Sequence, residues 1–189
     1  LYTPAGKDSI VRVNENGDKT NFRLEIVVKN DNYGVGVVEK GNTEIIAEMI
    51  AEETGADTFK IERATPYPAD YDACTEEAQQ EQRKNARPEL KNTLDNLDDY
   101  DVVYLGMPVW WGDMPMPVYT FVEGLDWNGK TVYPFTTHAG SRLSSIPRTL
   151  GNICDGATIG DGFTIAGTDA QNAQDKAKEA VTEWLRSNE

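Results

Sequence analysis

The sequence predicts one α/β domain built on a parallel β-sheet that helices cover on both faces. From about residue 42 onward, helical patterns alternate with short β-rich runs, which is typical of βαβ units. Residues 100–107, YDVVYLGM, form a nearly continuous apolar run, as expected for a central strand buried on both faces. The 189 residues, 39% of them hydrophobic, suffice for one core and are too few for two full domains.

Before this central strand, the sequence predicts an apolar helix, a strand and a polar segment. The helix begins at Asn42 or Thr43, and Gly55 is a suitable residue just past its end. Four apolar side chains recur within it at helical spacing: Ile45, Ile46, Met49 and Ile50. A strand, a proline-containing loop and a polar segment, either an exposed helix or an ordered excursion, follow at residues 57–62, 65–72 and 76–85.

After the central strand, helices and strands continue to alternate up to a final amphipathic helix. The expected elements are a helix at 117–125, a buried strand at 130–135, a short helix at 144–151 and a glycine-broken edge strand at 157–166. Thr168 and Gln171 form a possible capping box for the last helix. Trp184 lies on the apolar face of that helix and is expected in the core.

The N-terminal part of the chain follows a different pattern. We assign residues 1–21 to an N-terminal extension and residues 22–189 to the α/β domain. Asn16-Gly17 lies between two short β-rich runs and suggests a turn within a hairpin, although a linker or tag would fit residues 1–21 equally well.

The charge balance narrows the classes of partner. Eighteen Lys and Arg against thirty-two Asp and Glu give a net charge of −14, which disfavours binding to nucleic acid.

No apolar run reaches the roughly 18–20 residues of a membrane-spanning helix. The lack of a signal-peptide pattern favours a cytoplasmic location, although an exported chain whose signal had been removed would look the same. Cys74, Cys154 and His138 form neither a disulfide framework nor a zinc site, so we assign no metal.

Three polar or aromatic segments follow predicted strands, where ligands of open α/β sheets bind. Residues 41–44 open a helix whose backbone N–H groups suit a phosphate, or serve only as an ordinary N-cap. Residues 107–117, MPVWWGDMPMP, present adjacent tryptophans: one can fill the core while the other stacks on a flat ligand, or both can be buried. Residues 136–141, TTHAGS, form a small, hydroxyl-rich loop. Ser141 and His138 do not indicate a hydrolase, because the G-x-S-x-G motif is absent.

These segments, in this order, resemble the small bacterial flavodoxin family that has a P-x-W-W-G loop. The resemblance rests on GNTEIIAEMIAEETGAD (41–57), PYPADY (66–71), DDYDVVYLGMPVWWGDMPMPVYTF (98–121) and GKTVYPFTTHAGS (129–141). It implies a flavodoxin-like, doubly wound five-stranded parallel sheet of order 2-1-3-4-5 that binds FMN. Redox partner proteins or small electron acceptors are the implied partners, and no catalytic side chain is assigned.

The resemblance also implies a set of cofactor-binding residues. Gly41, Asn42 and Thr43 are similar to the end of the family's phosphate loop, and Lys40 could add charge there. Trp111 would stack on the flavin, and Gly112 is similar to a position whose peptide turns toward flavin N5 on reduction. The full expected set is Lys40, Gly41, Asn42, Thr43, Pro108, Val109, Trp110, Trp111, Gly112, Asp113, Thr136, Thr137, His138, Gly140 and Ser141.

The chain departs from the family at the phosphate loop. In the family the first strand leads directly into S-x-T-G-N-T, whereas here Val38 stands at the serine position. Alternatively, the first strand covers residues 22–28, residues 29–40 are an insertion, and Val28 replaces the serine. Either alignment removes a hydroxyl from the phosphate site, at a cost of about 1.5–3 kcal/mol. Two hypotheses follow: an FMN-dependent electron carrier or oxidoreductase, or a flavodoxin-fold binding module that has lost FMN.

Overall fold

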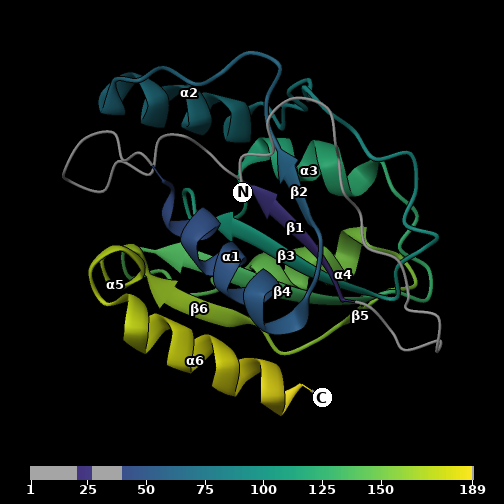
Figure 1. Ribbon diagram of the computed structural model, residues 1–189. Coiled ribbons are helices and arrows are strands. Elements are labelled where there is room, and N and C mark those ends of the chain that lie inside the picture. Colours follow the sequence, from purple (N-terminus) through teal and green to yellow (C-terminus); the bar gives the residue numbers. More distant parts are fainter. Residues whose placement is uncertain (1–20, 27–39, 189) are drawn as a thin grey trace.

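A computed structural model describes residues 21–26 and 40–188 of the chain. Helices and strands alternate along it, as predicted (Figure 1). The elements are β1 (Asn21–Ile26), α1 (Asn42–Thr54), β2 (Thr58–Ile61), α2 (Tyr71–Arg83), β3 (Val102–Pro108), α3 (Met116–Glu123), β4 (Thr131–His138), α4 (Ile146–Ile153), β5 (Thr158–Ile159), β6 (Phe163–Ala166), α5 (Gly167–Asn172) and α6 (Gln174–Ser187).

The sheet is parallel throughout and has the strand order β2-β1-β3-β4-β5, which confirms the predicted 2-1-3-4-5 arrangement. The fifth position holds two short strands, because β6 also pairs with β4. Residues 160–162, Gly-Asp-Gly, separate β5 from β6. The glycine-broken edge strand predicted at residues 157–166 is therefore present as two pieces, and the sheet of the described residues has six strands rather than five.

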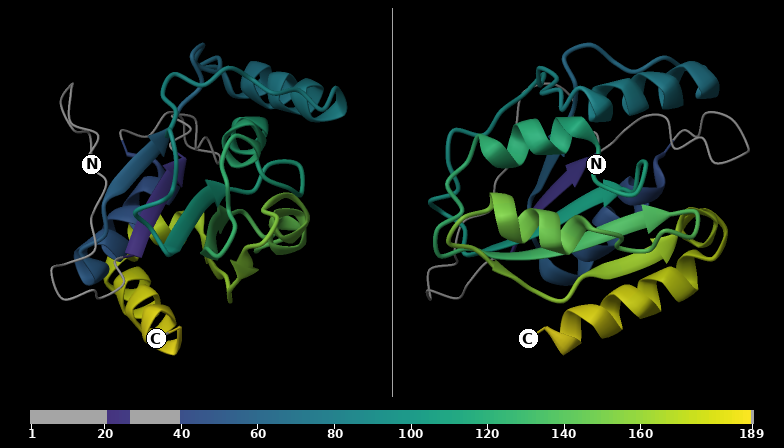
Figure 2. Two further views of the ribbon diagram at one scale, coloured as in Figure 1. Left: turned by 90° about the vertical axis from the view of Figure 1, so that its right-hand side faces the viewer. Right: turned by 180° about the vertical axis from the view of Figure 1, so that it is seen from behind.

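Helices lie on both faces of the sheet (Figures 1 and 2), and each face has its own hydrophobic core. On one face, α3 and α4 cover Val103 and Leu105 of β3, which are fully buried. On the other face, α1, α5 and α6 enclose Tyr104 and Phe135. Trp184 of α6 lies edge-on to Tyr104, with ring centroids 5.6 Å apart, and its predicted burial in the core is confirmed. Burial on both faces explains the continuous apolar run of β3.

Several predicted elements have different bounds in the structure. Helix α2 begins at Tyr71 rather than residue 76, because the Asp70 carboxylate accepts a hydrogen bond from the N–H of Ala73 and caps it. Strand β4 continues past residue 135 to His138, so Thr136 and Thr137 belong to a buried strand end rather than a loop. Helices α3 and α4 are displaced from their predicted ranges, 117–125 and 144–151, to Met116–Glu123 and Ile146–Ile153.

The predicted final helix is divided into α5 and α6 at Ala173, whose backbone leaves the helical region (φ −134°, ψ 47°). The expected capping box is absent. Thr168 lies inside α5, and the Gln171 side chain instead donates a hydrogen bond to the backbone carbonyl of Lys40, 2.8 Å away. This contact joins α5 to the beginning of α1.

The strand predicted at residues 22–28 is present as β1, which lies between β2 and β3. The proposed hairpin at Asn16-Gly17, most of the proposed insertion, and both Val28 and Val38 lie outside the described residues. Among the described helices, none is long and apolar enough to cross a membrane.

Candidate functional site

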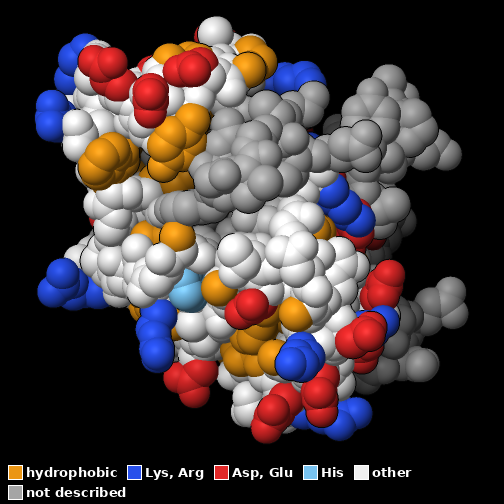
Figure 3. Space-filling model, turned by 90° about the vertical axis from the view of Figure 1, so that its left-hand side faces the viewer, with side chains coloured by type: hydrophobic (Ala, Val, Ile, Leu, Met, Phe, Trp, Pro, Cys, Tyr) orange, Lys and Arg blue, Asp and Glu red, His pale blue; other side chains and the backbone are white. Residues whose placement is uncertain are grey.

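The three segments singled out in the sequence meet at the carboxyl edge of the sheet. A hydrogen bond of 2.8 Å joins the buried hydroxyls of Thr43, in the first turn of α1, and Thr137, at the end of β4. The N–H of Val109, just after β3, donates to the Thr137 carbonyl at 3.1 Å. Figure 3 looks onto this edge: charged side chains lie mainly around its margin, and the pale-blue histidine lies at the surface. Thr137 thus links all three segments.

The first segment forms the amino end of α1. Gly41 is the N-cap residue and has no side chain that could cap the helix. Asn42 and Thr43 follow as buried residues, only 4% and 2% exposed. Partial positive charge at a helix N-terminus favours an anion. The ammonium of Lys40 is exposed and paired with Glu48 on the next turns of α1.

Gly167, which the sequence analysis missed, packs against this helix end. A Cβ added at Gly167 would lie only 2.4 Å from Nδ2 of the buried Asn42. A side chain at position 167 would therefore have to displace the buried Asn42 amide, and glycine lets the start of α5 approach the start of α1 without that displacement. Together with the bond from Gln171 to Lys40, this close approach fixes the position of residues 40–42.

The second segment is a tight turn at residues 110–113. The N–H of Asp113 donates to the carbonyl of Trp110 at 3.0 Å, and the N–H of Trp110 donates to the carbonyl of Asp113 at 2.9 Å. The two central residues, Trp111 and Gly112, both have left-handed backbones, with φ of 50° and 80°. This is the pattern of a type I′ turn, in which glycine is favoured and tryptophan is strained.

The two tryptophans of this turn point in different directions, as one of the two alternatives predicted. Trp110 packs against the core that α3 and α4 cover, and its ring lies edge-on to Tyr67 at a centroid distance of 5.1 Å. Trp111 is 54% exposed, and its indole N–H donates to the backbone carbonyl of Thr75 in α2 at 3.2 Å. The alternative in which both rings are buried is excluded.

Asp113 supports the turn from the side of α3. Its carboxylate accepts hydrogen bonds from the hydroxyl of Tyr119, at 2.8 Å, and from the N–H of Met114, at 2.9 Å. Burial, followed by the bond to Asp113, raises the pKa of Tyr119 to about 12. Tyr119 therefore remains a protonated donor at neutral pH and holds Asp113 in place.

The third segment begins inside the sheet and ends in an exposed loop. The Thr136 hydroxyl contacts the Arg142 carbonyl and the Thr164 hydroxyl, both at 3.1 Å, which explains why this polar residue can be fully buried. Nδ1 of His138 accepts a hydrogen bond from the N–H of Gly140 at 2.8 Å. The structure thus divides the expected residues by exposure: Gly41, Asn42, Thr43, Pro108, Val109, Thr136 and Thr137 are buried, Trp110, Asp113 and His138 are half-buried, and Lys40, Trp111, Gly112, Gly140 and Ser141 are exposed.

His138 provides a pH test of this loop. Burial, and then the charge of Arg142, lower its pKa below the usual 6.5, so the folded protein takes up this proton less readily than the unfolded chain. The contribution of His138 to stability is therefore present above pH 6.5 and is lost as the pH falls from there through the lowered value. We expect the ring to titrate below 6.5 in an NMR titration, which is unambiguous because the chain has one histidine. A pKa above 6.5 would contradict the partial burial of His138 beside the charge of Arg142.

Two serines that the sequence analysis did not select contact the turn at residues 110–113. The hydroxyls of Ser144 and Ser145, just before α4, both donate to the Gly112 carbonyl, at 2.5 and 3.1 Å. They connect the loop after β4 with the turn after β3. A sequence gives no signal for such a contact, since its partners lie more than 30 residues apart.

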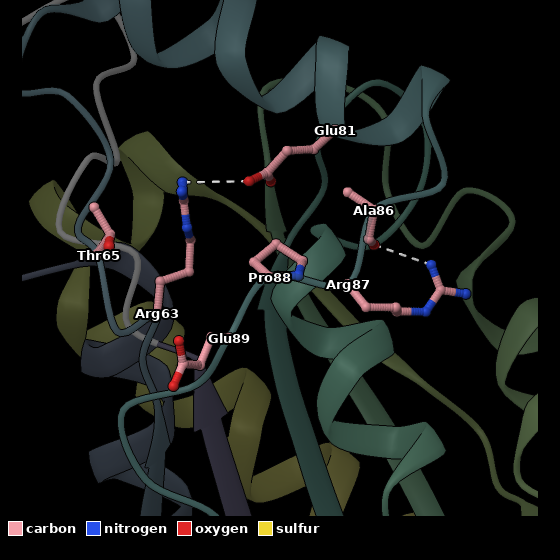
Figure 4. A pocket seen from close by; sticks show the side chains of 7 residues that line it. All are labelled: Arg63, Thr65, Glu81, Ala86, Arg87, Pro88 and Glu89. Carbon is pink, nitrogen blue, oxygen red and sulfur yellow. Dashed lines mark hydrogen bonds and ion pairs between the residues drawn. The ribbon is translucent and has the colours of Figure 1, made fainter.

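A separate pocket of about 200 Å³ lies beside the end of α2 (Figure 4). Its guanidinium groups are already paired: Arg63 with Glu77 and Glu81, and Arg87 with Glu123. The Tyr67 hydroxyl also donates to Glu81, and burial raises the pKa of that carboxyl. We interpret this cluster as the set of polar contacts that holds α2 against the connection between β2 and α2. No group of His, Cys, Asp and Glu side chains suited to a metal occurs among the described residues.

Comparisons with known proteins agree with this architecture. The model of the flavodoxin family matches residues 36–188. A protein from Bacteroides uniformis, provisionally described as a flavoprotein, is 26% identical with a TM-score of 0.71, over 89% of this chain and 98% of that one. A similarly described protein from Bacteroides eggerthii is 25% identical with a TM-score of 0.71, over 90% and 98%.

A more distant likeness concerns the fold alone. A flavoprotein from Lactobacillus acidophilus, whose crystal structure is a complex with FMN, is 18% identical with a TM-score of 0.58, over 84% of this chain and 99% of that one. Among curated proteins, none matches the chain.

Proposed function

The chain belongs to the flavodoxin family, and from this premise we propose that it binds FMN at the carboxyl edge of its sheet and transfers electrons through it. The flavin ring would lie against Trp111, and the phosphate would lie at the amino end of α1. The distant Lactobacillus acidophilus flavoprotein, described in complex with FMN, supports the choice of this flavin.

The observation that most supports this proposal is the exposure of Trp111. A tryptophan that is 54% exposed leaves a large apolar surface in water, and its left-handed backbone adds strain. A flat conjugated ligand that stacks on the indole would offset both costs in the ligand-bound protein. The bond from the indole to the Thr75 carbonyl fixes the orientation of the ring on one side, so a stacking surface exists before the ligand arrives.

The amino end of α1 fits a phosphate group. Backbone N–H groups of a first helical turn and the helix dipole both favour an anion. Of the two hydroxyls in the Thr43–Thr137 pair, one donates to the other, so one hydroxyl proton is not used within the pair. The serine hydroxyl that the family has here is replaced by valine in either alignment, and we therefore expect weaker phosphate binding than in the family.

The chain's own residues would bind and orient the cofactor, and FMN when bound would supply the transfer of one or two electrons. Trp111 would stack on the ring, while His138 at the end of β4, and Gly140 and Ser141 in the loop after it, would border the ring. The net charge of −14 would attract basic partner proteins and repel acidic ones. These roles fit either an electron carrier or a small oxidoreductase.

A parallel titration with FMN and riboflavin tests the proposal. We expect stoichiometric quenching of FMN fluorescence and about tenfold weaker binding of riboflavin, because riboflavin lacks the phosphate and its charge-assisted hydrogen bonds. Equal affinities would contradict the phosphate site at α1. No quenching by either flavin would favour a binding module without flavin.

A second assay on the FMN-loaded protein distinguishes carrier from oxidoreductase. Oxidation of NADH or NADPH in the presence of a quinone is followed by absorbance. Steady turnover indicates an oxidoreductase, whereas a carrier exchanges electrons only with a partner protein.

A further inference from the structure

The Gly112 carbonyl oxygen has no acceptor position left. A carbonyl oxygen has two lone pairs, and here the hydroxyls of Ser144 and Ser145 donate to it at 2.5 and 3.1 Å. The N–H of the same peptide, on Asp113, donates to the Trp110 carbonyl at 3.0 Å. Both ends of the peptide between Gly112 and Asp113 are therefore fixed by hydrogen bonds.

Strained backbone conformations are concentrated near the contact between Gly112 and the two serines. Four residues other than glycine have a positive φ within the described parts of the chain, and three of them are Trp111, Arg142 and Ser144. Trp111 precedes Gly112, and Ser144 is one of the two serines that bond to it. Strained backbone persists where its surroundings over-determine it, and it is concentrated at ligand-binding sites.

Steric packing, by contrast, does not hold the glycine. A Cβ built on Gly112 would meet only the Ser144 hydroxyl within 4 Å, at 3.7 Å. Gly112 is exposed, and glycine has the widest choice of backbone conformations. The orientation of its carbonyl is therefore set by the two hydroxyls and by the turn bond, rather than by neighbouring atoms.

We propose that Ser144 and Ser145 are positioning residues that lower the affinity of the site for reduced FMN relative to oxidised FMN. The inference rests on the proposed function, in which the flavin ring lies against Trp111, the residue before Gly112. Reduced FMN has a hydrogen on ring nitrogen N5, and this donor is absent from oxidised FMN. While both serines occupy the Gly112 oxygen, that oxygen cannot accept a hydrogen bond from N5–H. Loss of one hydroxyl frees an acceptor position for the reduced form only.

The test compares two dissociation constants, for oxidised and for reduced FMN. The first comes from the fluorescence titration, and the second from the midpoint potentials of bound and free FMN. In Ser145→Ala we expect the dissociation constant for reduced FMN to fall about fivefold to tenfold relative to that for oxidised FMN. A change of this size corresponds to the free energy of about one hydrogen bond. Ser145→Thr keeps a hydroxyl and should retain the wild-type ratio.

Two further variants separate this role from a structural one. Ser144→Gly removes both the hydroxyl and the strain at φ 49°, so it should shift the ratio in the same direction without loss of thermal stability. Ser187→Ala removes an equivalent bond in α6, from the hydroxyl to the Trp184 carbonyl at 2.7 Å, and should leave the ratio unchanged.

The outcomes also distinguish this inference from the proposed function. FMN binding with an unchanged ratio in both Ser144→Gly and Ser145→Ala would overturn the inference and leave FMN binding intact. Failure of the wild-type protein to bind FMN would overturn both. A shift of the same size in Ser187→Ala would show that the ratio reports general loosening, and would also overturn the inference.

Discussion

Replacement of Trp111 by alanine is expected to raise the dissociation constant for FMN about 100-fold, equivalent to about 2.7 kcal/mol. A tryptophan that stacks on a flat ligand contributes on this scale, because it removes a large apolar area from water on both partners. The change should hardly affect folding, since the side chain is 54% exposed in the unliganded protein. Quenching of FMN fluorescence gives the affinity, and thermal unfolding of the flavin-free protein gives the stability.

Trp111→Phe is the matched control for this variant. Like alanine, phenylalanine loses the hydrogen bond from the indole to the Thr75 carbonyl, but it keeps an aromatic face. We expect Trp111→Phe to bind FMN within about tenfold of the wild-type protein, as a smaller ring that still stacks. Wild-type affinity in Trp111→Ala would show that the flavin ring does not lie on this side chain.

Replacement of the neighbouring Trp110 by alanine should have the opposite profile. Trp110 packs against the core that α3 and α4 cover and lies edge-on to Tyr67, which in turn is bonded to Glu81 of α2. Truncation leaves a cavity and loosens the packing of Tyr67, so we expect the free energy of unfolding to fall by about 3 kcal/mol. The affinity for FMN should fall by less than about tenfold, because that ring does not face the ligand.

Urea denaturation of the flavin-free protein measures this loss. Trp110→Phe retains most of the packing and the edge-on contact with Tyr67, and it should lose less than about 1.5 kcal/mol. A loss below 1 kcal/mol in Trp110→Ala would contradict a core role for Trp110. Together, Trp111→Ala and Trp110→Ala test whether Trp111 contributes mainly to FMN binding and Trp110 mainly to stability.

The main elements of the fold could be predicted because their signals are local. The apolar spacing from Ile45 to Ile50 and the glycine after residue 54 define α1, and Gly55 indeed adopts a left-handed conformation with φ 67°. The apolar run of β3 follows from burial on both faces. The end of β4 was predicted too early, because Thr136 and Thr137 are polar. Their burial depends on hydroxyl partners in other segments, Thr164 and Thr43.

Helix α2 shows why a helix with few buried apolar side chains could not be assigned from the sequence. Within its 13 residues only Cys74 and Ala78 are buried, so no apolar stripe marks its face or its beginning. Polar contacts hold it instead, from Arg63 to Glu77 and from Tyr67 to Glu81. Such contacts have no sequence period, and the sequence therefore could not decide between an exposed helix and an ordered excursion.

The candidate site was only partly predictable. Its three segments could be chosen because each follows a strand of a parallel sheet. Gly167, Ser144 and Ser145 could not, since their roles depend on contacts with Asn42 and Gly112 across the fold. The positive φ of Trp111 was equally hidden, because tryptophan does not favour a left-handed backbone.

An NMR titration of the ¹⁵N-labelled protein with FMN tests the central claim most directly. The chain has four tryptophans, and two of them, Trp127 and Trp184, lie buried in the two cores. We expect large shifts for the indole N–H of Trp111 and for the backbone amides of residues 41–43, with little change at Trp127 and Trp184. Shifts confined to residues around the Arg63 pocket, with Trp111 unaffected, would contradict the placement of FMN at the carboxyl edge of the sheet.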